Sequence, residues 1–263
     1  MQFRRPMERG LNRPFLVLGT EEGNPDSGRT PLVVKSNAGF RHRPEIVIRE
    51  LFALLLARKV GILVPEPVLV RFPDGFEYGA AEFPDYADLI RQSSGWNLAT
   101  VHLGNSWKPW PNTTSPKSIA REDLETAFCF DAMVQNTDRE PENPNLLWKG
   151  KELVLIDFDK AFGYLRTFEA EAQPWRKALV RQNLPGHCLH RHLAALGDSQ
   201  LRGRFLWEAF VEFRVETGSD AISREVGTDP PDPGLDLPRL ETYLKKLEDH
   251  TDDFFRCLTE LSR

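Results

Sequence analysis

Two polar segments, separated by a short apolar run, place the strongest constraint on how this chain can fold. The first, residues 136–147, is rich in turn-forming residues and offers Asp138 and, five residues later, Asn143. The second begins with a strand-like apolar run at residues 153–156, which ends directly before Asp157. The chain is therefore expected to form a polar turn, a strand and a second polar turn in close succession.

Asp138, Asn143 and Asp157 together supply the groups that phosphoryl transfer from a nucleotide requires. One carboxylate orients the acceptor hydroxyl and accepts its proton, while amide and carboxylate oxygens hold Mg²⁺ against the phosphates of ATP. The order and spacing match the base and metal loops of the protein-kinase superfamily, so Asp138 is the predicted catalytic base and Asn143 and Asp157 are the predicted metal ligands. A plain surface turn would also be rich in Asp, Asn and Pro. The pair of segments, followed by Lys-Ala-Phe-Gly at residues 160–163, favours the catalytic interpretation.

Composition and charge limit the classes of protein to which the chain can belong. Its 263 residues allow one large domain or two lobes with a substantial core. The net charge of −5 and the pI of about 5.8 argue against nonspecific binding of nucleic acid. No apolar run approaches the roughly 20 residues of a membrane span, and no signal peptide is visible. Three cysteines without C-x-x-C spacing indicate a reducing compartment, so a cytoplasmic protein is expected.

The pattern of apolar residues changes near residue 84. Residues 1–84 are predicted to form a strand-rich N-lobe, and residues 85–263 a mostly helical C-lobe that carries both polar segments. The fold class is therefore α+β, with the two lobes of a kinase. Residues 93–118, rich in aromatic residues and proline, are expected to be an irregular insertion. The expected strands lie at 15–18, 31–35, 68–70 and 76–81, and the expected helices at 44–60, 121–135 and 240–261.

Lys35 ends a predicted strand of the N-lobe, where a lysine can reach the α- and β-phosphates of a nucleotide. Such a lysine needs a carboxylate from the following helix to hold it in place. Glu50, fifteen residues on, lies at the edge of that helix's apolar stripe and is the preferred partner. Glu45 is the alternative, although in the first turn its negative charge already has a helix-dipole explanation. For Lys35 itself, the alternative is a solvated lysine at the end of a strand.

Two further segments are weaker candidates for contacts with the nucleotide. The loop at residues 7–14 contains only Gly10, so it does not match G-x-G-x-x-G. Its backbone N–H groups are candidates to cover the phosphates, with Arg9 or Arg13 nearby, and a simple β-turn is an equal alternative. Glu82 and Phe83, at the predicted junction of the lobes, are expected to present backbone groups to the edge of the adenine ring.

His187, His190 and His192 suggest a metal site. Their spacing fits no standard four-ligand zinc pattern, and the sequence offers no partner pair of cysteines. We therefore expect structural histidines here.

The letters themselves resemble a known family. Asn-x-Asp-Arg-x-x-x-Asn-Pro-Asn-Leu-Leu at residues 136–147, followed by Leu-Ile-Asp-Phe-Asp-x-Ala-Phe at 155–162, is similar to the short HipA-like kinases, bacterial relatives of the toxin kinase HipA. The resemblance spans about residues 5–165. It implies a bilobal kinase fold, ATP with Mg²⁺, and a protein serine or threonine as substrate. It also implies that Asp138 is the base, that Asn143 and Asp157 bind metal, and that Lys35 contacts the phosphates.

The sequence departs from the family pattern at two places. Glu140 stands where the family usually has histidine, which alters the packing of the loop more than its chemistry. The loop at residues 7–14 lacks the serine that HipA-type kinases can autophosphorylate, so inhibition by that route is not assumed.

The leading hypothesis is a serine/threonine protein kinase that serves as the toxin of a toxin–antitoxin pair or as a defence element. Its expected partners are a protein substrate and an antitoxin or other regulatory protein. No direct contact with nucleic acid or membrane is expected. One alternative is a kinase for a small alcohol or a lipid headgroup. Another is a nucleotide-binding pseudokinase that serves as an interaction module. The joint presence of Lys35, Asp138, Asn143 and Asp157 argues against the pseudokinase.

Overall fold

A computed structural model describes residues 1–7, 10, 12–24, 26–41, 43–111, 117–163, 186–190 and 236–261. The chain divides into two compact units, each with its own contacts. The described part of the first unit lies within residues 1–51 and 65–104, and that of the second within 52–64, 105–163, 186–190 and 236–261. Among the described residues, no helix is both long and apolar enough to cross a membrane.

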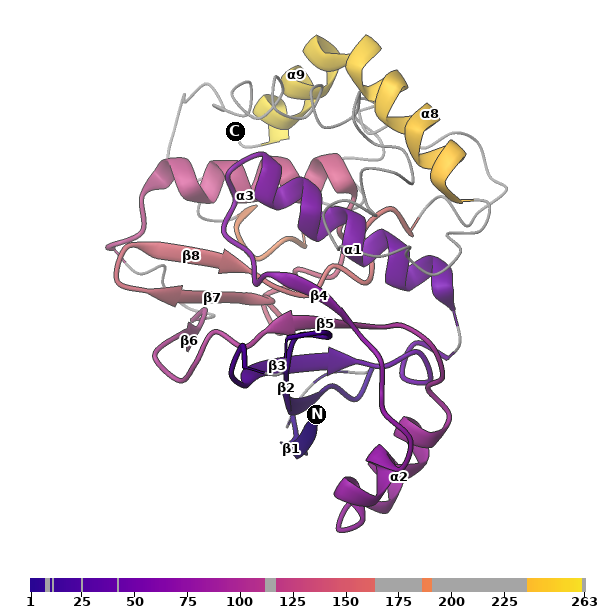
Figure 1. The fold of residues 1–263 in the computed structure, drawn as a ribbon. Helices are drawn as coiled ribbons and strands as arrows, with labels where there is room; N and C mark the ends of the chain where they lie inside the picture. Colours follow the sequence, from indigo (N-terminus) through magenta and orange to yellow (C-terminus); the bar gives the residue numbers. More distant parts are fainter. Residues whose placement is uncertain are drawn as a thin grey trace. The chain divides into compact units, whose positions relative to one another are not determined.

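The first unit is built on a five-stranded antiparallel sheet in the order β1-β2-β3-β5-β4 (Figure 1). Alternate residues of β2 and β3 are buried, as expected for strands with one face against a core. Leu32 and Val34 therefore face the apolar cluster, whereas Val33 and Lys35 face the other side of the sheet. The strands are β1 (Gln2–Pro6), β2 (Phe15–Gly19), β3 (Thr30–Lys35), β4 (Pro67–Val70) and β5 (Asn97–Val101).

The face of the sheet that bears Leu32 and Val34 packs against η1 (Phe76–Ala80) and α2 (Pro84–Arg91). The strand predicted at 76–81 is wrong, because η1 is a 3₁₀ helix. Gly75, with φ of 77°, turns the chain into it, and Phe76 and Ala80 are both buried in the same cluster. A strand here would need a neighbouring strand to satisfy its backbone hydrogen bonds. The 3₁₀ turns satisfy them within the segment instead.

Strand β5 corrects two predictions. It lies inside the segment expected to be irregular, and it pairs with both β3 and β4. The first unit consequently continues to Gly104 rather than ending at residue 84. Asn97 and Ala99 are weak strand formers, which concealed the strand. Asn97 is buried, and its side chain accepts a hydrogen bond from the N–H of Asn37, so tertiary contacts outweigh its low propensity.

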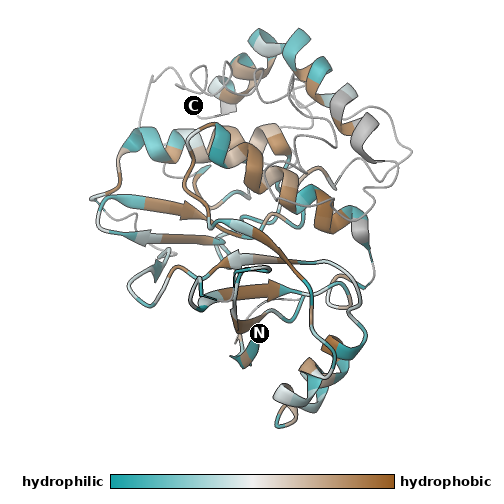
Figure 2. Cartoon of the chain, in the orientation of Figure 1, coloured by the Kyte–Doolittle hydropathy of each residue, from teal (hydrophilic) through white to brown (hydrophobic). Residues whose placement is uncertain are grey.

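Helix α1 (Pro44–Lys59) confirms the helix predicted at 44–60. It is apolar along most of its length (Figure 2), and the boundary between the two units falls within it, after Leu51. The helix ends at Gly61, whose φ of 82° suits glycine. The N–H of Gly61 bonds the carbonyl of Arg58, and the N–H of Ile62 bonds that of Ala57, which is the Schellman pattern of a helix C-terminus.

The second unit holds a three-stranded antiparallel sheet, β6-β7-β8, and helix α3, which confirms the helix predicted at 121–135. The predicted final helix is instead two helices, α8 and α9, which meet at His250. The hydroxyl of Tyr243 on α8 donates to the carbonyl of Met133, 2.7 Å away, and so attaches α8 to the end of α3. The bounds are β6 (Lys108–Pro109), α3 (Arg121–Val134), β7 (Leu146–Lys149), β8 (Glu152–Leu155), α8 (Asp236–Asp249) and α9 (Thr251–Leu261).

Candidate active site

The β7–β8 hairpin brings the two polar segments of the second unit together. Its register pairs Leu146 with Leu155, so the residue before β7 and the residue after β8 lie at the same end of the hairpin. There the N–H of Ile156 donates to the carbonyl of Asn145, 3.0 Å away. Asp157 follows directly, with φ of 60°. An antiparallel pair of short strands therefore places the loop of Asp138 beside Asp157.

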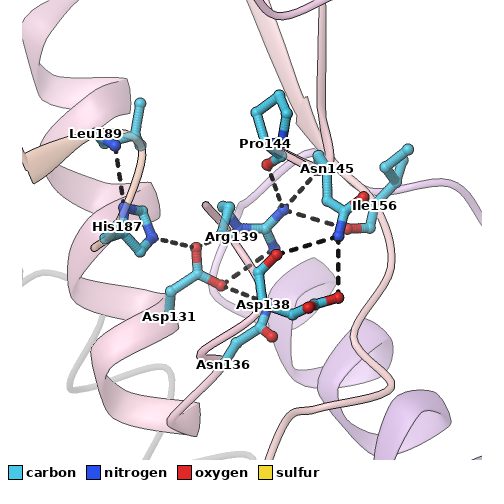
Figure 3. A network of polar contacts seen from close by, with 9 residues as sticks. All are labelled: Asp131, Asn136, Asp138, Arg139, Pro144, Asn145, Ile156, His187 and Leu189. Atoms are coloured by element: carbon cyan, nitrogen blue, oxygen red, sulfur yellow. Dashed lines mark hydrogen bonds and ion pairs between the residues drawn. The ribbon is translucent and has the colours of Figure 1, made fainter. Parts of the chain in front are cut away.

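Arg139 connects the two loops from the inside (Figure 3). Its side chain is fully buried and forms an ion pair with Asp131 of α3. The Nη1 atom donates to the carbonyl oxygens of Pro144, Asn145 and Ile156, at 3.4, 2.5 and 3.2 Å. The first two carbonyls belong to the loop of Asp138 and the third immediately precedes Asp157. A single guanidinium thus fixes the backbone of both loops to one helix.

Asp138 lies half-buried in this loop. The pKa of its carboxyl is raised, first by burial and then by the negative charges of Asp159 and Asp157, and Lys160 opposes the rise. A raised pKa moves a carboxylate towards the value at which it accepts a proton efficiently near neutral pH. Asp157 and Asp159 therefore lie close enough to Asp138 for their charges to act on it.

Asn145 accompanies Asp138, whereas Asn143 does not. The Nδ2 of Asn145 lies 3.4 Å from the carbonyl oxygen and 3.5 Å from Oδ2 of Asp138. Because both partners are acceptors, the NH₂ group must face them, and the Oδ1 atom faces the other way. Asn143 is exposed, on a turn where its N–H bonds the carbonyl of Glu140. The role of Asn143 as a metal ligand stays a prediction, and Asn145 is a second amide of the same loop, directly before β7.

The donor set fits a magnesium ion. Among the described residues, no group of three or more His, Cys, Asp or Glu side chains is arranged as a complete metal site. Mg²⁺ does not require one, because it is usually bound by one or two carboxylates together with phosphates and water. Asp157 and the Oδ1 of Asn145 are oxygen donors at the same end of the hairpin. Burial raises the pKa of Asp138 most, and the charges of Asp159 and Asp157 raise it further; a cation would relieve the repulsion among these carboxylates.

Lys35 and Glu50 form an ion pair within the first unit, as predicted. Lys35 closes β3 on the face opposite the apolar cluster, and Glu50 extends from α1 with 2% of its side chain exposed. Glu45 lies in the first turn of α1, and its carbonyl accepts a hydrogen bond from Nε of Arg49. The contact of Lys35 with phosphate stays a prediction.

Glu82 and Phe83 lie elsewhere in the first unit. Phe83 precedes α2, and its ring packs against that of Phe3 on β1, with 5.8 Å between the ring centroids. Helix α2 covers the face of the sheet that bears Leu32, and Lys35 points away from that face. Glu82 and Phe83 therefore lie on the side of the sheet away from Lys35, and their contact with the adenine ring stays a prediction.

Gly10 belongs to the loop between β1 and β2. The N–H of Met7 bonds the carbonyl of Pro14, and the N–H of Arg13 bonds that of Gly10. A Cβ atom at Gly10 would lie 2.8 Å from Cδ of Pro14, and its φ is 120°, so the turn itself requires glycine. A role over the phosphates stays a prediction, and Arg9 lies outside the described residues.

His187 has both ring nitrogens in hydrogen bonds (Figure 3). Its Nδ1 accepts from the N–H of Leu189 at 3.1 Å, which leaves Nε2 as the protonated nitrogen that donates to Asp131 at 3.0 Å. Burial lowers the pKa of His187 and keeps the ring neutral, although the carboxylate of Asp131 opposes this shift. A ring used in this way has no nitrogen left for a metal, which supports a structural histidine. His192 lies outside the described residues.

The antiparallel sheet with its Lys–Glu pair and the two carboxylate loops together define a kinase-type phosphotransferase. The chain belongs to the HipA-like kinase family, whose model matches residues 1–174. Nine chains of solved structures also match. One is the Helicobacter pylori proinflammatory kinase CtkA, with 13% identity over 95% of each chain and a TM-score of 0.47. No curated protein matches the chain.

Proposed function

We propose that this kinase transfers the γ-phosphoryl group of ATP, with Mg²⁺, to a serine or threonine hydroxyl of a protein. The observation that carries the proposal is the hairpin register, which sets a carboxylate of raised pKa, Asp138, beside the oxygen donors Asn145 and Asp157. Membership of the HipA-like family supports ATP and a protein substrate. On the same basis we propose an antitoxin or other regulatory protein as a partner.

Each residue then has a defined part in the reaction. Asp138 accepts the proton of the acceptor hydroxyl as its oxygen forms a bond to the γ-phosphorus, and the bond from that phosphorus to the bridging oxygen breaks to release ADP. Asp157 and Asn145 would hold a magnesium ion, and such an ion would neutralise charge on the phosphates. Lys35, held by Glu50, contacts the α- and β-phosphates.

The first test is incubation of the protein with labelled ATP and Mg²⁺, alone and with a cell lysate, followed by intact-mass analysis. We expect a phosphoprotein band in the lysate that depends on Mg²⁺. Label in lipid or small metabolites, with none in protein, would replace the proposed substrate class by the small-molecule alternative. ATP with Mg²⁺ should also raise the melting temperature, because a ligand that binds only the native state stabilises it. The absence of a shift at millimolar ATP, together with no transfer, would contradict the proposal.

Asp157→Ala and Asp159→Ala form a matched pair for the metal role. Both carboxylates act on the pKa of Asp138, and Asp159 acts more strongly than Asp157. Asp157→Ala should abolish Mg²⁺-dependent transfer, since it removes a carboxylate that would hold the cation, and the cation is what compensates the phosphate charge. If Asp159→Ala were the inactive variant and Asp157→Ala stayed active, the assignment of the metal loop would be wrong by two residues.

A further inference from the structure

Asp131, Arg139 and His187 form a buried polar network that the proposed chemistry does not use directly. The side chains of Asp131 and Arg139 have no exposed surface, and that of His187 has 2%. Burying a charged pair is costly unless its hydrogen bonds are satisfied. Here each carboxylate oxygen of Asp131 has two partners: Arg139 and His187 at Oδ2, and Arg139 and Asn136 at Oδ1. Both oxygens of Asp131 are therefore satisfied, and His187 is one of the three residues that bond to it.

His187 belongs to residues 186–190, which contact helix α3 at one point and the loop of Asp138 at another. Its imidazole reaches Asp131, and the N–H of Cys188 donates to the carbonyl of Arg139 at 2.8 Å. Leu189 is fully buried, and the ring of Phe128 on α3 meets the imidazole edge-on, with 5.1 Å between the centroids. The segment is thus anchored both to α3 and to the backbone of the residue that follows Asp138.

A continuous chain of hydrogen bonds leads from His187 to the reacting groups. His187 holds Asp131, Asp131 holds the guanidinium of Arg139, and Arg139 holds the carbonyls of Asn145 and Ile156. Asn145 contacts Asp138 through its side chain. Ile156 directly precedes Asp157 in the sequence, so the last link of the chain is the peptide bond between them. Any rotation of the guanidinium would therefore move the backbone on both sides of the site.

We propose that His187 is a positioning residue for phosphoryl transfer, and that it acts through Asp131 and Arg139 to fix the loop of Asp138 relative to Asp157. This inference rests on the proposed function. The neutral imidazole suits the role, because it adds a donor to Asp131 without adding a second buried cation beside Arg139. Supporting groups of this kind typically change activity by about ten- to a hundredfold when they are removed.

The test compares two amides that differ only in reach. In His187→Gln the side-chain NH₂ can occupy the position of Nε2 and still donate to Asp131, whereas the shorter amide of His187→Asn occupies the position of Nδ1 and cannot. We expect His187→Asn to lower kcat by about ten- to a hundredfold. The KM for ATP should change less than about threefold, because the contacts with nucleotide are elsewhere. His187→Gln should recover most of kcat.

Two controls separate positioning from stability. His190→Asn removes a second imidazole from the same segment and should leave kcat close to that of the wild type. All rates are measured well below the melting temperature of each variant and normalised to the folded fraction. Equal kcat in the Asn and Gln variants of His187 would overturn the inference.

Arg139→Lys provides a second test, which also decides the matter if His187→Asn does not fold. Lysine keeps the charge opposite Asp131, but its single ammonium nitrogen cannot replace both the Nε and Nη2 bonds to Asp131 and the Nη1 bonds to the carbonyls. We expect a similar loss of kcat with little change in the KM for ATP, and an unchanged kcat would overturn the inference. An inactive wild-type protein would overturn the proposed function and this inference together. An active wild type with unaffected variants would overturn the inference alone.

Discussion

The Lys35–Glu50 pair of the first unit and the Asp131–Arg139–His187 network of the second solve the same problem in different ways. Lys35 stands at the end of a strand and Glu50 within a helix, so both backbones are already fixed by regular hydrogen bonds. Arg139 and its partners instead organise loops, where the backbone has no ladder of its own. A functional side chain on a regular element needs one partner, whereas a functional loop needs a buried network beneath it.

The largest effect is expected within the loop region, at Asp138. Asp138→Asn should keep the fold and bind ATP almost normally, yet lose about two to four decades in the rate of transfer, because the asparagine cannot accept the proton. Turnover and thermal stability are to be measured on the same preparation. An unchanged rate would show that Asp138 is only a turn residue.

The second prediction compares the stability that each region provides. Arg139→Met should lower the free energy of unfolding by about 3–5 kcal/mol, since it leaves the charge of Asp131 buried without its partner. Lys35→Met should cost less, about 1.5–3 kcal/mol, the range for a hydrogen bond to a charged group, because Lys35 keeps 15% of its side chain exposed whereas Arg139 is fully buried. Urea unfolding of the two variants and the wild type measures both. Equal losses would mean that the two regions do not differ in the way described.

The third prediction concerns the amide of the loop. Asn145→Ala should lower transfer by about tenfold and raise the Mg²⁺ concentration required, because it removes an oxygen donor and the contact with Asp138. Asn143→Ala, two residues away on the exposed turn, is the matched control and should behave like the wild type. A Mg²⁺ titration of the two variants distinguishes them, and the reverse result would assign the metal to Asn143 instead of Asn145.

The smallest effect is a dependence of stability on pH. The pKa of Asp138 is raised in the folded protein, so the folded protein binds a proton at this carboxyl more tightly than the unfolded chain does. The favourable contribution is fully present below the unfolded pKa and is lost as the pH rises through the folded pKa. Asp138→Asn should therefore melt slightly higher than the wild type at neutral pH, and the difference should vanish in acid. A variant that melts lower at neutral pH would contradict this.

Residues whose position follows from the strand or helix that carries them could be predicted from the sequence. The pairing of Lys35 with Glu50 followed from the positions of a strand end and a helical stripe, and the structure shows that bond. Asp157 was located by the apolar run before it. The contact of Asn145 with Asp138 could not be predicted in this way, because it depends on how many residues the loop places in its turn before β7 begins.

By itself, the sequence determined the elements whose signals are local: helices α1 and α3, strands β2 and β3, and the two polar segments around Asp138 and Asp157. Apolar periodicity and turn residues act over a few positions, so they can be read along the chain. Only the tertiary structure decided that Asn97 lies in a strand, that Asn145 faces Asp138, and that His187 reaches Asp131 across 56 positions. Such contacts depend on register and packing between distant segments, and the hydrogen bonds of a buried network outweigh the weak preferences of the individual residues.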